Sequence, residues 1–68
     1  MERKHYSFEG CGSPKFQGVN IYQGWMTEND MITMAQGIVV GLRQYCKGAI
    51  VVVYEEMKDN WHLARVQE

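Results

Sequence analysis

The sequence contains few cysteines, almost no proline and no long apolar run. Its 68 residues include 2 Cys and 1 Pro. A single disulfide between Cys11 and Cys46 would be sparse for a secreted protein of this size, so we expect two reduced thiols. The longest apolar run extends only from Ala49 to Tyr54. A bilayer-spanning helix needs about 20 apolar residues, so no membrane segment is predicted.

An excess of charge of either sign is also missing. Lys and Arg total 7 and Asp and Glu total 8, which gives a formal net charge of −1. Nucleic acids and anionic membranes are usually bound through a basic surface, so this balance disfavours both as partners. No apolar stretch of signal-peptide length follows the basic residues near the N-terminus. We therefore expect a complete cytoplasmic protein.

The apolar fraction of 46% is sufficient for one compact core, so residues 1–68 are predicted to form a single domain. A core from so short a chain is marginally stable unless a disulfide, a metal or oligomerisation supports it. With the first two disfavoured, we expect a homo-oligomer. An origin in phage or another mobile element is a general expectation for a stand-alone domain this small, and no residue pattern carries it.

The clearest local pattern predicts a helix over residues 28–47. Thr27 is a good N-cap, and Glu28 and Asp30 place negative charge in the first turn. Gly48 is placed to end the helix in a left-handed conformation. Apolar residues recur at spacings of three and four along one helical face. They are Met31, Met34, Ala35, Ile38, Leu42 and Tyr45.

Four extended segments surround this helix. Residues 49–57 are rich in β-branched side chains, 58–60 resemble a turn, and 61–66 alternate as a returning strand. Residues 16–25 also look extended, residues 5–9 suit a short strand, and the glycine-rich segment between them reads as a loop. The predicted fold is α+β in ββαββ order, a small antiparallel sheet packed on one long helix.

The strand predicted over residues 49–57 is apolar on both faces. Alternation puts Ile50, Val52 and Tyr54 on one side and Val51, Val53 and Met57 on the other. A strand that is hydrophobic on both faces is usually buried on both, whereas one helix covers only one face. Either another molecule or the N-terminal segment is therefore expected to cover the second face.

The alternation in residues 16–25 predicts two groups of side chains. The first group is Val19, Ile21 and Trp25, and the second is Phe16, Asn20 and Tyr22. We expect Phe16 and Tyr22 to share the sheet face away from the helix with Tyr54, and His62 to join them if the hairpin register allows.

Two glycines within the predicted helix, Gly37 and Gly41, match the spacing that lets two backbones approach closely. Glycine inside a helix costs about 0.5–1 kcal/mol relative to alanine, so a packing reason is expected. That reason is contact either with the protein's own sheet or with a helix of a second subunit. The predicted oligomer interface comprises Gly37, Val40, Gly41 and Val52.

Patterns typical of catalysis or metal binding are weak. Cys11 stands between glycines, but nothing in the spacing brings His5 or His62 near it as a base. The cysteines and histidines are scattered without a close pair, so no metal and no cofactor are predicted. Glu55 and Glu56 are adjacent on a strand and should point to opposite faces, which argues against a carboxylate pair.

Aromatic side chains are abundant, and Tyr and Trp are favoured anchors of protein interfaces. The leading hypothesis is a non-enzymatic protein-binding module, an inhibitor or adaptor, that binds a protein partner through Tyr22, Tyr54, Trp61 and His62. The alternative is an oligomer that binds a small molecule or nucleotide in pockets at subunit boundaries. Polar contacts in those pockets would come from Asn20, Gln23, Arg43 and His62.

Overall fold

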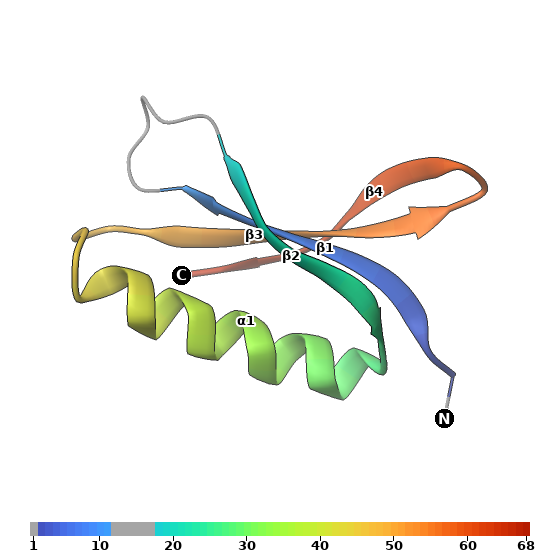
Figure 1. The fold of residues 1–68 in the computed structure, drawn as a ribbon, viewed down its shortest axis with the longest axis horizontal. Helices are drawn as coiled ribbons and strands as arrows, with labels where there is room; N and C mark the ends of the chain where they lie inside the picture. Colours follow the sequence, from blue (N-terminus) through green and yellow to red (C-terminus); the bar gives the residue numbers. More distant parts are fainter. Residues whose placement is uncertain (1, 12–17) are drawn as a thin grey trace.

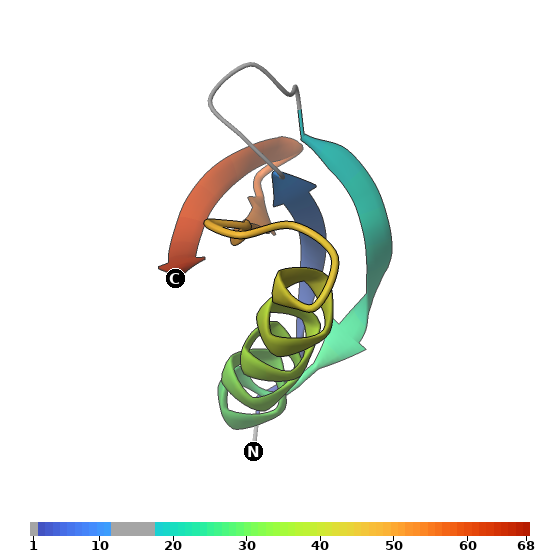
Figure 2. The same ribbon diagram turned by 90° about the vertical axis from the view of Figure 1, so that its left-hand side faces the viewer.

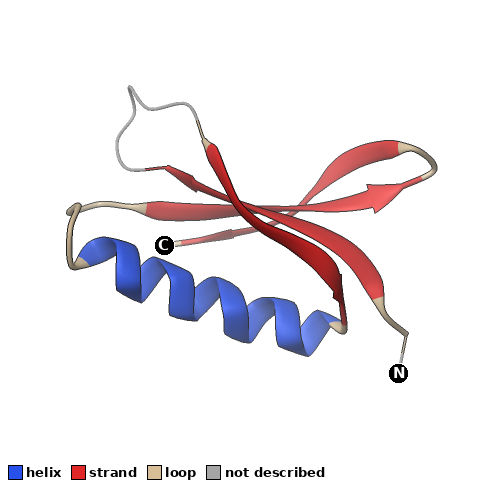
Figure 3. Ribbon diagram, viewed as in Figure 1, coloured by secondary structure: helices blue, strands red, loops and turns tan. Residues whose placement is uncertain are grey.

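The computed structural model describes residues 2–11 and 18–68. Along the chain the elements are β1 (Lys4–Cys11), β2 (Val19–Met26), α1 (Glu28–Arg43), β3 (Ile50–Met57) and β4 (Asn60–Gln67). The four strands form one antiparallel sheet in the order β2-β1-β3-β4. Figure 3 shows one helix and this sheet, which confirms the predicted α+β fold and its ββαββ order.

The helix lies across one face of the sheet, and the sheet curls around it (Figures 1 and 2). In Figure 2, which looks along the helix, the edge strands β2 and β4 lie to either side of α1. The central strands β1 and β3 run behind it. The sheet therefore has one face against the helix and one face turned away from it.

The core lies between α1 and the two central strands. Tyr6 and Phe8 of β1 and Val51 and Val53 of β3 are fully buried at the centre of this cluster. The helix contributes one buried residue from each of three successive turns, namely Met31, Ala35 and Val39. The predicted division of β3 into two faces is confirmed at these positions, because Val51 and Val53 face the helix and the intervening residues do not.

The start of α1 agrees with the prediction, whereas its end does not. The Thr27 hydroxyl oxygen accepts a hydrogen bond from the Asp30 backbone N–H at 3.2 Å, as an N-cap should. The helix ends at Arg43, and Tyr45, expected on the core face, is 90% exposed. The chain must turn back here to bury Ala49 and begin β3, and Gly48 adopts a φ of +80° within that turn.

The strand β1 is longer than the predicted 5–9, whereas β2 runs from Val19 to Met26 rather than over 16–25. Gly10 and Cys11, assigned to a loop by sequence, are the last two residues of β1. The rest of that predicted loop, with Phe16, lies outside the described residues. Neither β1 nor β2 folds over the second sheet face, so that alternative is wrong for the described chain. The physical reason is that β1 pairs through its backbone with β2 on one side and β3 on the other.

Within the described residues, α1 is the helix to consider for membrane insertion, and it is not long and apolar enough to cross a bilayer.

Candidate functional site: the open face of the sheet

A bulge in β2 decides which of its side chains face away from the helix. Phe8 pairs with Tyr22 but Glu9 pairs with Asn20, so Ile21 is an extra residue on β2. An extra residue reverses the alternation of side chains beyond it. The predicted grouping is therefore wrong for Tyr22, whose ring lies 6.3 Å from that of Phe8 on the helix side. Trp25 is instead on the same face as Asn20.

The β3–β4 turn decides the placement of Trp61 and His62. Lys58 and Asp59 form a two-residue turn with φ values of 50° and 68°, which fixes the pairing of the hairpin. Trp61 consequently pairs with Glu56 on the face away from the helix. His62 pairs with Glu55 on the helix side, so its expected grouping with Tyr54 is wrong.

We define the open face as the strand side chains that point away from α1, and they form three rows across the sheet. Each row takes one residue from each strand in the order β2, β1, β3, β4. The rows are Trp25–His5–Glu56–Trp61, Gln23–Ser7–Tyr54–Leu63 and Asn20–Glu9–Val52–Val66. Trp25 is 64% exposed and Leu63 is 62% exposed, so this face presents apolar surface to its surroundings.

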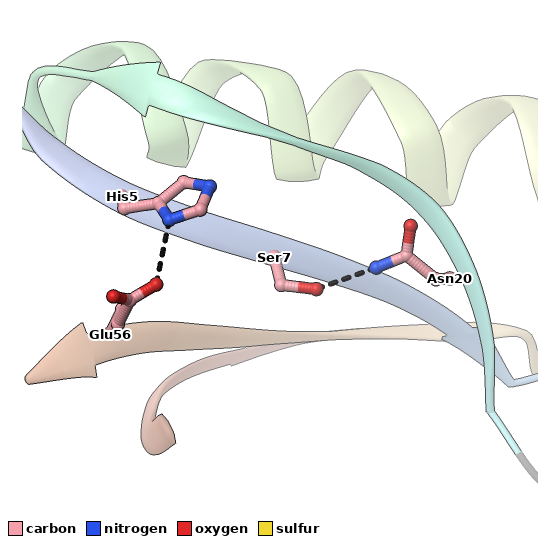
Figure 4. Close-up of polar contacts among 4 residues, drawn as sticks. All are labelled: His5, Ser7, Asn20 and Glu56. Atoms are coloured by element: carbon pink, nitrogen blue, oxygen red, sulfur yellow. Dashed lines mark hydrogen bonds and ion pairs between the residues drawn. The ribbon is translucent and has the colours of Figure 1, made fainter. Parts of the chain in front are cut away.

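In the first row, His5 lies between the two tryptophans of the chain. Its ring stacks on Trp25 with centroids 5.1 Å apart and an interplanar angle of 8°. Trp61 lies on its other side, with centroids 5.2 Å apart and a tilt of 56°. The Nδ1 atom of His5 is 2.9 Å from a carboxylate oxygen of Glu56 (Figure 4). These contacts connect all four strands at this end of the open face.

The second row contains the shortest side chain of the central strands on this face, Ser7, which is only 8% exposed. Its hydroxyl accepts a hydrogen bond from the side-chain Nδ2 of Asn20 at 2.6 Å (Figure 4). Larger neighbours surround this short side chain and leave a hollow of about 310 Å³. The hollow is lined by Ser7, Glu9, Gln23, Tyr54 and Trp61.

The open face carries carboxylates but no strong cation. Glu9 and Glu56 belong to it, while none of the side chains in the three rows is Lys or Arg. Glu55 points to the helix side, where its carboxylate lies 3.5 Å from the Nζ atom of Lys4. The prediction that Glu55 and Glu56 separate onto opposite faces is thus confirmed.

The pKa values of two residues on the helix side are shifted. The Glu55 carboxylate raises the pKa of Lys4 above its usual 10.5. Burial, followed by the same carboxylate, raises the pKa of Tyr6 above 10.0. Both groups therefore hold their protons more firmly in the folded chain, and neither belongs to the open face.

The four residues predicted for an oligomer interface are not brought together. Gly37, Val40 and Gly41 lie on α1, whereas Val52 belongs to the open face on the far side of the sheet. A Cβ atom added at Gly37 or Gly41 would meet nothing within 4 Å. Close contact with the protein's own sheet is therefore the wrong explanation for these glycines.

Groups suited to covalent or metal chemistry do not converge in the described chain. Cys11 and Cys46 are not joined by a disulfide. Across residues 2–11 and 18–68, no three His, Cys, Asp or Glu side chains are placed to hold a metal ion. Arg43, suggested as a pocket residue, donates instead to the backbone carbonyl of Ala49 at 3.1 Å.

The sequence interpretation missed Ser7, Glu9 and Trp25 as members of the open face. The alternation of polar His5, Ser7 and Glu9 with apolar Tyr6 and Phe8 was a usable signal for the first two. Trp25 had no such signal, because its face depends on the bulge at Ile21.

No protein-family model, curated protein or solved structure matches this chain. Its function is therefore interpreted from the residues of the open face themselves.

Proposed function

We propose that this chain is a protein-binding module that works by contact rather than catalysis, with the open face as its binding surface. The observation that carries the proposal is the gathering of exposed apolar and aromatic side chains on the sheet face that α1 does not cover. Apolar patches of this kind are typical of interaction sites, and Trp and Tyr are frequent anchors within them. The open face contributes the exposed side chains of Trp25, Trp61, Leu63 and Val66 and the half-buried ring of Tyr54.

The charge of the open face supports a protein partner over a nucleic acid. Sheet surfaces that stack nucleobases also carry Lys or Arg to hold the phosphates. Here Glu9 and Glu56 add negative charge among the aromatic rings, which would repel a phosphate backbone. A protein surface that is apolar and locally cationic fits this distribution better.

The binding residues proposed from the structure differ in part from those predicted by sequence. Tyr54 and Trp61 keep the proposed role, because both line the hollow on the open face. Tyr22 and His62 lie on the helix side of the sheet, so they are not included in the proposed binding surface. Trp25 and Leu63 take their place, since they are the most exposed apolar residues of the open face.

A matched pair of substitutions tests this surface. Leu63 on the open face and Val40 on the outer face of α1 are both 62% exposed, so changing either to serine removes comparable apolar surface. Reversible cross-linking first captures a partner of the wild-type protein. The partner is then purified, and its affinity for the wild type and for each variant is measured. We expect Leu63→Ser and Trp61→Ala to weaken that complex, the latter by about 30-fold, and Val40→Ser to leave it unchanged. Loss of binding in Val40→Ser alone would contradict the proposal.

We further propose that, without a partner, two copies of the chain cover each other's open face. The outer face of α1 is a poorer candidate, because Val40 is surrounded there by exposed polar residues and glycine. These are Thr33, Gln36, Gly37 and Gln44. Light scattering should give a dimer that Leu63→Ser converts to a monomer and Val40→Ser does not. A wild-type monomer, or a dimer lost only in Val40→Ser, would contradict this assignment.

The hollow is the specific observation that favours the second candidate function, small-molecule binding. The hollow is formed by residues of one chain, and in the proposed dimer it lies where the two open faces meet. Of the polar residues suggested by sequence, Gln23 lines it. Thermal shift against a panel of metabolites and nucleotides separates the two functions, because a ligand of the native state raises the Tm further as its concentration increases. A compound that does so, and fails to do so in Ser7→Val, would favour the small-molecule function.

A further inference from the structure

We propose that the hollow on the open face receives an arginine side chain of the partner protein. This inference rests on the proposed function, because it identifies the chemistry that the partner presents to the same surface. It follows from the aromatic lining of the hollow, from a carboxylate at its margin that has no cationic partner among the described residues, and from the size of the hollow.

The aromatic lining suits a planar cation. Tyr54 and Trp61 line the hollow, while Ser7 leaves space between them and β2. A guanidinium group is flat and weakly hydrated, so it stacks on aromatic rings through cation–π attraction while its edge donates hydrogen bonds. An ammonium group on a lysine side chain lacks this planar geometry.

The carboxylate of Glu9 supplies the opposite charge. Of the three glutamates on the central strands, Glu55 is paired with Lys4 and Glu56 with His5. Among residues 2–11 and 18–68, no cationic side chain lies within ion-pair distance of Glu9. The glutamate that lines the hollow is thus the one whose carboxylate has neither a lysine nor a histidine partner in the described chain.

Hydrogen bonding at the hollow also matches a guanidinium. A carboxylate can accept two parallel N–H bonds from arginine, which is the strongest arrangement for this pair of groups. The side-chain carbonyl of Gln23, another lining residue, is available as an additional acceptor. Ser7 is nearly buried and already accepts one hydrogen bond from Asn20, so Glu9 and Gln23 are assigned as the main acceptors for the incoming cation.

The size of the hollow points to one side chain of a larger partner. Ligand pockets generally range from about 300 to 1,000 Å³, and this one, at about 310 Å³, lies at the lower limit. The exposed residues Trp25 and Leu63 lie on the two edge strands, to either side of the central strands that carry Ser7 and Tyr54. A protein that covers Leu63 and Trp25 would therefore enclose an arginine side chain inserted between them.

An NMR titration with N-acetyl-arginine amide tests this assignment without knowledge of the partner. It is run on the Leu63→Ser chain, because that substitution is expected to keep the chain monomeric and Leu63 does not line the hollow. The comparison compound is N-acetyl-citrulline amide, which is nearly the same shape and keeps the Nε–H/NH2 donor edge. It carries no charge, because a carbonyl oxygen replaces the other terminal nitrogen. We expect saturable shifts of the Trp61 indole N–H, the Gln23 side-chain amide and the Glu9 backbone amide with the arginine compound. The citrulline compound should bind at least about tenfold more weakly, because a charge-assisted bond is lost.

Two isosteric variants separate a specific site from general attraction between opposite charges. Glu9→Gln should weaken binding of the arginine compound at least about tenfold. Glu55→Gln removes the same charge from the helix side of the sheet and should leave the shifts and their midpoint unchanged. Spectra of both variants must retain the wild-type dispersion, which shows that they are folded.

The arginine assignment is overturned by an absence of saturable shifts, by equal binding of the two compounds, or by undiminished binding in Glu9→Gln. Each of these results leaves the open face itself to be decided by Leu63→Ser and Trp61→Ala against the protein partner. Conversely, saturable binding of the arginine compound would support the cation site even if the partner bound Leu63→Ser and Trp61→Ala unchanged. That combination would reject the open face as the interface with that partner.

Discussion

The imidazole of His5 lies parallel to the indole of Trp25, with ring centroids 5.1 Å apart. His5 is on the central strand β1 and Trp25 is on the edge strand β2, so the stack joins two segments separated by 20 positions in the sequence. Trp61 of the other edge strand contacts the opposite side of the same ring. One histidine thus holds in place the two largest side chains of the open face.

The first prediction concerns this histidine. His5→Ala removes both ring contacts and leaves Glu56 without its partner, so we expect the free energy of unfolding to fall by about 1–2 kcal/mol. His5→Phe keeps an aromatic ring between the tryptophans and should recover part of that loss. Urea unfolding followed by tryptophan fluorescence measures both. Equal stability of wild type and His5→Ala would show that the stack contributes nothing.

The second prediction is a loss of stability at alkaline pH. Burial first, and the Glu55 carboxylate second, raise the pKa of Tyr6 above 10.0, and Glu55 raises the pKa of Lys4 above 10.5. In both cases the folded chain binds more protons than the unfolded chain at pH values between the ordinary pKa of the group and its raised pKa. The free energy of unfolding should therefore be independent of these two groups below about pH 10. It should fall as the pH rises through their raised pKa values.

Tyr6→Phe provides the control for that pH dependence. The variant lacks the ionisable hydroxyl, so its stability should fall less steeply above about pH 10 than that of the wild type. Urea midpoints measured from about pH 8 to pH 11 give the two slopes. Identical slopes would mean that the tyrosine is not the group responsible.

The third prediction contrasts two glycines. A Cβ atom at Gly37 meets nothing within 4 Å, so Gly37→Ala should stabilise α1 by about 0.5–1 kcal/mol. Gly48 has a φ of +80°, and Gly48→Ala should destabilise the chain by about 1 kcal/mol although the space around it is also open. Thermal unfolding should show shifts of opposite sign. A lower Tm for Gly37→Ala, with loss of the dimer by light scattering, would instead support an interface at the helix.

The fourth prediction concerns the start of α1. Thr27→Ala removes the acceptor for the Asp30 N–H and should cost about 1 kcal/mol. Thr27→Ser retains a hydroxyl oxygen at the same position and should stay close to the wild type. The comparison is made by urea unfolding monitored by far-UV circular dichroism. A loss of equal size in both variants would point to the missing methyl group rather than to the cap.

Local chemistry was sufficient to predict the elements of this fold. The Thr27 cap and the apolar spacing identified α1, and the β-branched run in 49–57 with its following turn identified the C-terminal hairpin. These features depend on residues a few positions apart, which the linear order places together. The end of the helix was predicted less well, because burial of Ala49, rather than the properties of residues 44–47, decides where the chain turns.

Which side chains lie on the open face could be decided only from the tertiary structure. Side chains alternate along a strand, so one extra residue at Ile21 moves Trp25 onto this face, and the pairing of Met57 with Asn60 moves His62 off it.

By itself, the sequence determined a helix, a C-terminal hairpin, two extended N-terminal segments and a strand that is apolar on both sides, since each follows from local propensity and periodicity. Only the tertiary structure decided that Glu9, Tyr54 and Trp61 surround one hollow. Strand order and register, fixed by backbone pairing between distant segments, set which side chains become neighbours.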